Sequence, residues 1–269
     1  MASAAVAEPL PIVALHHVPR GPLSEFVELF WYYRGHDVEY SKERILPMPN
    51  TELIIFLEEG PNWTGISGPQ SESFIIERSS MDEILGVHFK PGGIFPFLRF
   101  PLSELHGRHV GLDDVWGRQA AGELVCRLHE TATVDAKFRL IEEWLQRIAV
   151  HPLQHHPAVS FALREFERDS GLTSSARIAE RVGFSQRRFI ELFRNQIGMT
   201  PKLYCRVQRF QGVITRVEKA MDVDWADVAL ECGYFDQSHF NHDFREFSGL
   251  SPTEYMELRT QHHSHVQVR

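Results

Sequence analysis

The segment between residues 186 and 194 holds side chains that can read DNA base pairs. Arg187 can donate paired hydrogen bonds to O6 and N7 of guanine, and Glu191 can accept one from N4 of cytosine. Ile190 suits the methyl group of thymine, while Arg188 and Arg194 suit phosphate oxygens. The alternative for each arginine is an ordinary solvated surface charge. The candidate DNA contacts of this segment are Gln186, Arg187, Arg188, Ile190, Glu191 and Arg194.

A second candidate set lies further along the chain. Asn and Gln side chains can read adenine through paired hydrogen bonds. The set consists of Gln237, Ser238, Asn241, His242 and Arg245. It lies among the acidic residues Asp236, Asp243 and Glu246, whose charge repels phosphate. We therefore expect the first set to dominate DNA affinity and the second to add little beyond shape contact.

The charge of the 269-residue chain is unevenly distributed. The formal net charge of −8 by itself argues against a nucleic-acid partner. Residues 161–219, however, contain 12 basic and 6 acidic side chains, whereas residues 220–260 contain 2 basic and 9 acidic ones. A basic field confined to one segment favours a local nucleic-acid-binding surface.

Both candidate sets belong to an internal repeat with an offset of 50 or 51 residues. Residues 178–184 (Ile-Ala-Glu-Arg-Val-Gly-Phe) correspond to residues 228–234 (Val-Ala-Leu-Glu-Cys-Gly-Tyr). Six further positions of the first copy have identical residues in the second copy. They are Phe189, Phe193, Arg194, Gly198, Pro201 and Tyr204, which correspond to Phe240, Phe244, Arg245, Gly249, Pro252 and Tyr255. A repeat of this period indicates a duplicated supersecondary unit. Each copy has the pattern helix, glycine-containing turn, helix, which is the helix-turn-helix pattern of DNA-binding proteins.

The chain between the two copies predicts how they are held apart. Thr200-Pro201 begins a helix, and Lys202–Ala220 is predicted to form one helix about 27 Å long. That length can place two recognition helices about one DNA turn apart, roughly 34 Å, on one face of the duplex. The same repeat can also pack against something other than DNA, so an interaction adaptor without DNA binding is the rival interpretation.

Residues 158–260 resemble the DNA-binding domain of AraC/XylS-type transcriptional regulators. Four motifs carry the resemblance: Ile178-Ala-Glu-x-x-Gly-Phe-Ser185, Phe193-Arg-x-x-x-Gly-x-Thr-Pro201-x-x-Tyr204, Ala229-x-x-x-Gly-Tyr-Phe-Asp236-Gln-Ser-His-Phe240 and Phe244-Arg-x-Phe-x-Gly-x-Ser-Pro252-x-x-Tyr255. The resemblance implies seven helices, recognition helices at about 185–196 and 236–247, and a central linker helix. Residues 47–53 and 86–93 are similar to the sensor domains attached to such regulators.

The first 150 residues have a different character. Residues 12–110 alternate short apolar runs with Gly and Pro turns, which predicts an antiparallel β barrel or sandwich. The expected strands are Phe26–Tyr33, Leu53–Leu57, Phe74–Ile76 and Ile84–Phe89, with a short helix as the alternative for Ser24–Tyr33. The apolar period then becomes helical, which predicts helices near 113–130 and 134–149.

The predicted fold class is therefore α+β with two domains: an antiparallel β barrel or sandwich with flanking helices, then an all-α tandem helix-turn-helix domain. The prolines at 152 and 157 mark the boundary because they disfavour helix in the residues before them. The expected divisions are a flexible leader over 1–11, a β-rich sensor or dimerisation domain over 12–150, a linker over 151–157, the DNA-binding domain over 158–260 and a tail over 261–269.

Glu52 and His88 lie on predicted strands and are candidates for a ligand site, although ordinary packing explains each equally. Two histidine groups, at 151, 155 and 156 and at 262, 263 and 265, can bind metal only loosely. The sequence contains no Cys-x-x-Cys, phosphate-binding loop or Gly-x-Ser-x-Gly motif. We therefore expect no enzyme, no cofactor and no metal.

The expected protein is a cytoplasmic regulator whose partner is double-stranded DNA. Its three widely spaced cysteines suit a reducing compartment, and no apolar run approaches the roughly 20 residues of a membrane span. A small-molecule effector and RNA polymerase are further candidate partners, and the family resemblance implies a homodimer. A second rival is a β-barrel metal-binding or small-molecule-binding protein with a helical appendage.

Overall fold

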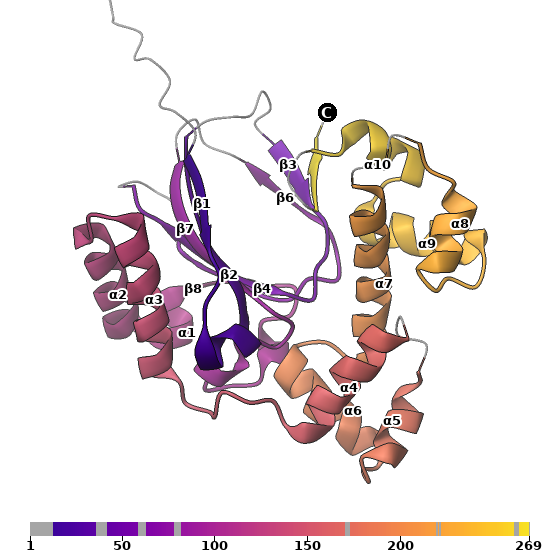
Figure 1. The fold of residues 1–269 in the computed structure, drawn as a ribbon, viewed down its shortest axis with the longest axis horizontal. Helices are drawn as coiled ribbons and strands as arrows, with labels where there is room; N and C mark the ends of the chain where they lie inside the picture. Colours follow the sequence, from indigo (N-terminus) through magenta and orange to yellow (C-terminus); the bar gives the residue numbers. More distant parts are fainter. Residues whose placement is uncertain are drawn as a thin grey trace, which may run out of the picture.

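A computed structural model gives the structure of the chain. It describes residues 13–35, 42–58, 63–77, 82–169, 173–218, 220, 222–260 and 264–268. The expected leader over residues 1–11 lies outside this part of the chain. Figure 1 shows strands in one half of the molecule with helices against their outer side, and a group of helices in the other half.

An antiparallel sheet of six strands forms the centre of the N-terminal half, in the order β1-β2-β7-β4-β5-β8. Its strands are β1 Val13–His17, β2 Val27–Gly35, β4 Thr51–Phe56, β5 Gly65–Ser67, β7 Asp82–Phe89 and β8 His109–Gly111. Three of the four strands expected from the sequence lie in this sheet, and the fourth, at Phe74–Ile76, lies in the second sheet. The helical alternative for Ser24–Tyr33 is wrong apart from the short 3-10 turn Gly21–Glu25.

A second sheet has the order β6-β3-β9. It consists of β3 Lys42–Ile45, β6 Phe74–Glu77 and β9 His265–Gln267. The described strands form two separate antiparallel sheets, so the sandwich-like alternative is confirmed and a closed barrel is not formed. The strand β9 comes from the segment that we expected to be a tail, yet it pairs with β3 through Glu43, Arg44 and Ile45.

Three helices cover one face of the six-stranded sheet (Figure 1). They are α1 Leu112–Trp116, α2 Arg118–Glu130 and α3 Val134–Ile148. The helix expected over 113–130 is divided at Gly117, whose φ of 83° lies in the left-handed region that glycine adopts without strain. Phe138 and Trp144 of α3 are buried against sheet residues such as Phe30, because apolar side chains alternate along each strand.

Seven helices follow in the described part of residues 157–258, as the family resemblance implied. They are α4 Pro157–Arg168, α5 Ser175–Arg181, α6 Gln186–Ile197, α7 Pro201–Val217, α8 Trp225–Glu231, α9 Gln237–Ser248 and α10 Pro252–Leu258. The linker helix α7 begins at Pro201, as predicted, but ends at Val217 rather than near 220. None of the described helices is long and apolar enough to cross a membrane.

The two halves of the molecule contact each other at both ends of the helical half. At the entrance, His151 stacks on Phe95 with ring centres 4.8 Å apart, and His155 lies 5.0 Å from Phe26. These two histidines thus pack on different aromatic rings of the N-terminal half.

At the exit, the helical half returns to the second sheet. Leu46 N donates to Ser264 O at 2.9 Å, and Gln211 Nε2 of α7 donates to the carbonyl of Pro47 at 2.7 Å. Arg44 Nη1 donates to the carbonyl of Ser248 at the end of α9 (2.8 Å). The helical half is therefore held by its entering linker and by its returning strand.

Candidate nucleic-acid interface

The first helix-turn-helix unit comprises α5, the turn at residues 182–185 and α6. The turn passes through Gly183, whose φ of 72° favours glycine. Ser174 caps α5 and Ser185 caps α6, each by accepting a hydrogen bond from the backbone N–H three residues later. On the inner side of α6, Phe189 and Phe193 are fully buried, which leaves the opposite side of the helix to solvent.

The second unit, α8 to α9, repeats this geometry. Gly233 has a φ of 81°, and Asp224 and Asp236 replace the two serine caps. The ring packing is repeated as well: Phe193 meets Tyr204 edge-on at 5.5 Å, and Phe244 meets Tyr255 edge-on at 5.7 Å. The predicted duplication is therefore confirmed down to the orientation of its aromatic side chains.

All of the polar residues singled out on α6 are exposed, and Ile190 is half-buried beside them. Arg188 lies over the ring of Phe184 at 4.5 Å, which directs its guanidinium along the turn. Arg194 faces the N-terminal half: burial lowers the pKa of His106, and the positive charge of Arg194 lowers it further. The structure thus brings the first candidate set to one surface whose far end lies near the N-terminal half.

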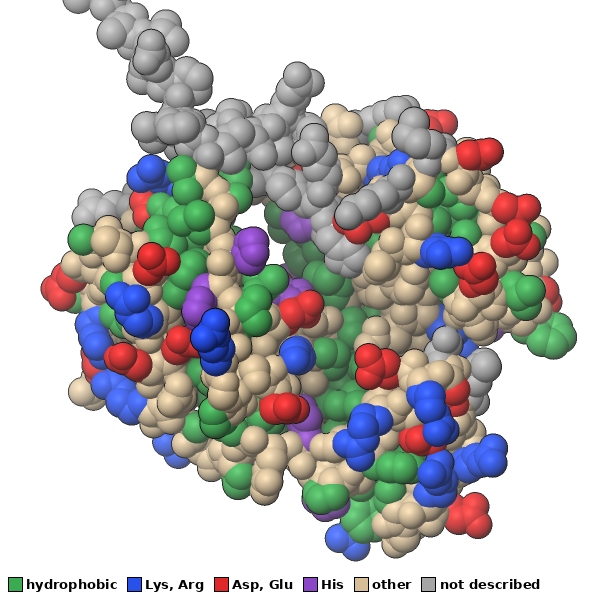
Figure 2. Space-filling model, in the orientation of Figure 1, with side chains coloured by type: hydrophobic (Ala, Val, Ile, Leu, Met, Phe, Trp, Pro, Cys, Tyr) green, Lys and Arg blue, Asp and Glu red, His purple; other side chains and the backbone are tan. Residues whose placement is uncertain are grey.

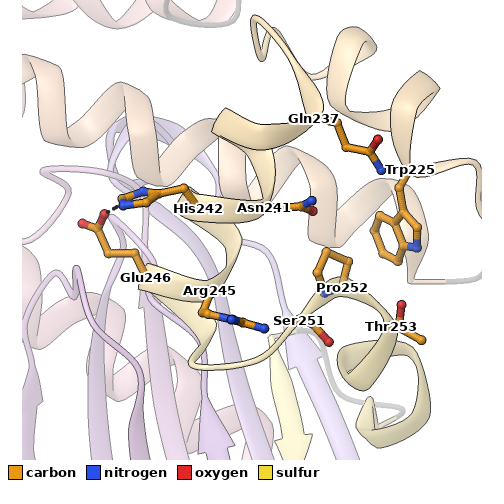
Figure 3. Close-up of a pocket in the computed structure, with 9 residues that line it drawn as sticks. All are labelled: Trp225, Gln237, Asn241, His242, Arg245, Glu246, Ser251, Pro252 and Thr253. Atoms are coloured by element: carbon orange, nitrogen blue, oxygen red, sulfur yellow. Dashed lines mark ion pairs between the residues drawn. The ribbon is translucent and has the colours of Figure 1, made fainter.

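The second candidate set is exposed along α9. Gln237, Asn241 and Arg245 line a pocket of about 760 Å³ between α8, α9 and the start of α10. Figure 3 shows Asn241 and Arg245 pointing toward this pocket, while His242, which also lines it, pairs with Glu246 at 3.6 Å. Of the five candidates, His242 is therefore engaged by the acidic side chain of Glu246.

An ionic cluster that the sequence analysis did not identify fixes α9 to the linker helix. Arg206 of α7 donates from Nη2 to Asp243 and to Glu246, each at 2.7 Å. The side chain of Asp243 is only 3% exposed, and Arg206 also lies over the ring of Phe247 at 4.9 Å. The acidic residues near α9 were recognised in the sequence, but their partner lies 37 positions away on another helix.

The charges of the two units differ on the surface as they do in the sequence. Figure 2 shows Lys and Arg side chains gathered over α4, α5 and α6, and mainly Asp and Glu side chains over the region of α8 and α10. The second unit also exposes two large apolar side chains, Leu230 and Phe235, the latter 90% exposed. The two units share a backbone and present different chemistry.

The two ligand candidates of the N-terminal half are brought together. Glu52 and His88 are paired across β4 and β7, and their side chains are in direct contact. Trp31 Nε1 donates to Glu52 at 3.2 Å, and Glu28 lies 3.4 Å from the other ring nitrogen of His88. Burial lowers the pKa of His88, but the charges of Glu52 and Glu28 outweigh this effect and raise it.

Comparison with known proteins finds a family match in each half of the chain. Residues 178–258 match a family described as "Helix-turn-helix domain", and residues 15–111 match one described as "Domain of unknown function (DUF6597)". The resemblance of the C-terminal half to AraC/XylS-type regulators is confirmed.

Two relatives and one solved structure illustrate the likeness. The HTH-type transcriptional activator RhaR of Klebsiella pneumoniae is 26% identical over 251 residues, which cover 86% of this chain and 85% of RhaR. An HTH-type transcriptional regulator of Haemophilus influenzae is 24% identical over 187 residues, covering 66% of this chain and 56% of that protein. The crystal structure of ToxT from Vibrio cholerae, at 12% identity and a TM-score of 0.40, covers 92% of this chain and 96% of ToxT.

Proposed function

We propose that this chain, a DNA-binding transcriptional regulator with an AraC-type C-terminal domain, binds DNA mainly through the first helix-turn-helix unit. In this proposal Arg187 and Glu191 contact bases, Ile190 contacts a thymine methyl group, and Arg188 and Arg194 bind phosphate. The second unit contributes through the exposed side chains of Gln237, Ser238, Asn241 and Arg245 on α9.

One observation carries the proposal: two units of the same backbone geometry have opposite charge. Residues 161–219 have a surplus of six basic side chains, whereas residues 220–260 have a surplus of seven acidic ones. Neutralising phosphates with basic side chains releases counterions and supplies much of the affinity for DNA. The first unit therefore gains from approaching the duplex, while the acidic side chains beside α9 oppose that approach.

The N-terminal half is proposed as a sensing or dimerisation domain, over residues 12–150, with 151–157 as linker. The cluster of Glu52, His88 and Trp31 is the proposed effector site, since it combines a charged hydrogen-bonding pair with an aromatic ring on the same sheet. RNA polymerase and a second copy of the chain are proposed partners. The domain's effector and its oligomeric state are independent of the assignment of DNA binding to the first unit.

Binding of the full chain to fluorescent duplex DNA, measured across a salt series, tests the proposal. We expect the logarithm of the binding constant to fall linearly with the logarithm of salt concentration, by about 0.9 for each phosphate contacted. Arg188→Ala should flatten this slope by about one phosphate, and Arg127→Ala, an exposed arginine of α2, should not change it.

The result that would overturn the proposal is also defined. If neither random duplexes nor DNA from upstream of the gene binds in a salt-dependent way, the chain is an adaptor that has lost DNA binding. If Arg188→Ala leaves the slope unchanged while Arg245→Ala flattens it, DNA is held through the second unit instead.

A further inference from the structure

One side of α9 carries four side chains that are common metal ligands. They are His239, His242, Asp243 and Glu246, at spacings of three, four and seven residues along the helix. Residues three or four positions apart lie on the same side of a helix. Histidine nitrogen and carboxylate oxygen are the donor atoms that bind zinc and similar divalent transition metals.

The distances between these donor atoms are already short. One ligand atom from each of His242, Asp243 and Glu246 lies within 4.8 Å of the other two. His242 Nδ1 is 3.6 Å from Glu246 Oε2 and 3.9 Å from Oδ1 of Asp243, and His239 Nε2 is 3.8 Å from Oδ2 of Asp243. Metal–ligand bonds of about 2.1 Å place neighbouring tetrahedral ligands roughly 3.4 Å apart, so small side-chain movements suffice.

One buried carboxylate oxygen of this group lacks a hydrogen-bond partner. Asp243 is nine-tenths and more buried, and its Oδ2 atom has no hydrogen-bond partner. Its other oxygen accepts from Arg206 at 2.7 Å. A buried carboxylate oxygen without a partner is costly, and His239 Nε2 lies 3.8 Å from it, beyond hydrogen-bond length.

We propose that His239, His242, Asp243 and Glu246 form a site for a divalent transition metal of the zinc type on the second recognition helix. The metal binds Asp243 through Oδ2 and takes Glu246 from Arg206. Arg206 keeps its hydrogen bond to the other oxygen of Asp243 and its position over Phe247. His242 and Glu246 already lie together on α9, paired at 3.6 Å (Figure 3).

Occupancy changes what α9 presents to DNA. The metal adds two positive charges beside Asp243 and Glu246, which otherwise oppose phosphate. It also holds His242 away from the bases, leaving Asn241 and Arg245 as the free polar side chains of that helix turn. The second unit thereby becomes a metal-dependent contributor to DNA affinity, a consequence that rests on the proposed function, whereas the metal site itself does not.

Titration of the full chain with Co²⁺, followed by visible absorption in the absence of DNA, tests the site. We expect one equivalent to bind with the spectrum of nitrogen and oxygen coordination, and Zn²⁺ to displace it. His242→Gln and Glu246→Gln should each weaken Co²⁺ binding by at least about tenfold. Both side chains are on the surface, with His242 75% exposed, so a thermal melt should confirm that the variants fold.

The matched control is the double variant His262→Gln/His263→Gln, which removes the competing histidine pair near the C-terminus. It should bind Co²⁺ as the parent chain does. The proposal is overturned if the parent chain binds no stoichiometric Co²⁺, if the two α9 variants bind it unchanged, or if only the control loses it. Failure of Co²⁺ binding would leave the salt-dependent DNA binding of the first unit untouched.

Discussion

The two helix-turn-helix units show the same fold built for different tasks. Each buries two phenylalanines of its second helix against a tyrosine that follows, and each turns at a glycine with positive φ. The first is capped by serines and is basic, while the second is capped by aspartates and is acidic. The comparison shows that the buried residues determine the fold of the unit, whereas the exposed and capping residues determine its charge.

The units also differ in how they are held. Leu192 of the first unit occupies the repeat position of Asp243, so the first unit packs there through an apolar side chain. The second unit is tied to α7 by Arg206 instead. In this ionic cluster, removing one partner leaves the other charge buried without compensation. We therefore expect single substitutions in the cluster to lower the stability of the second unit more than substitutions at the matching positions of the first.

The largest expected effect tests what the units share. Phe193→Ala and Phe244→Ala each remove a fully buried ring and should each lower the free energy of unfolding by about 3–5 kcal/mol. Denaturant unfolding followed by circular dichroism measures both. Similar losses support equivalent cores. A loss confined to one variant would break the equivalence of the two units.

The next largest effect concerns the ionic cluster of Arg206, Asp243 and Glu246. Arg206→Ala leaves the buried carboxylate of Asp243 without its partner and should cost about 3 kcal/mol. The control is Arg216→Ala, since Arg216 pairs with Glu231 in an exposed bridge that should contribute less than about 1 kcal/mol. Thermal unfolding measures the loss of stability in both variants. Equal losses would show that the ionic cluster contributes no more than a surface ion pair.

A smaller effect concerns DNA recognition. Arg187→Ala should weaken binding to a specific duplex by about 1–3 kcal/mol, because it removes a paired contact to guanine. Asn241→Ala should weaken binding much less, since α9 approaches phosphate against its own acidic charge. Fluorescence anisotropy of both variants on one duplex decides the order. The reverse order would assign the leading role to the second unit.

The smallest effect separates stability from binding. Ser185→Ala and Asp236→Ala each remove a helix cap and should cost about 1 kcal/mol of stability. Asp236→Ala also removes a negative charge at the start of α9, so it should strengthen DNA binding while it weakens the fold. Ser185→Ala should bring no such gain. Paired melting and binding curves test this divergence, which fails if both variants change DNA affinity alike.

Much of the fold was predictable because its causes are local or periodic. The repeat located both units, and Thr200-Pro201 marked a helix start that the structure confirms. The division of the first flanking helix at Gly117 was not predicted, because an isolated glycine can be accommodated within a helix or can end it. The end of α7 at Val217 was missed by a few residues for a similar reason, since helix ends follow weak signals.

The candidate site was predictable in composition but not in its partners. The exposed residues of α6 and α9 follow from helical periodicity, which leaves one side of each helix polar. The Arg206–Asp243 pair joins two helices 37 positions apart, and the contact of Glu52 with His88 depends on the register of β4 and β7. Such contacts arise from tertiary packing and leave no pattern in a single sequence.

The returning strand β9 has a mechanical consequence. The chain enters the helical half through a linker whose histidines pack on Phe95 and Phe26, and it leaves through a strand bonded to β3. A segment fixed at one end can swing freely, whereas one fixed at both ends can only twist between its anchors. A large rotation of the pair of helix-turn-helix units against the sheets would therefore have to break the ladder between β3 and β9.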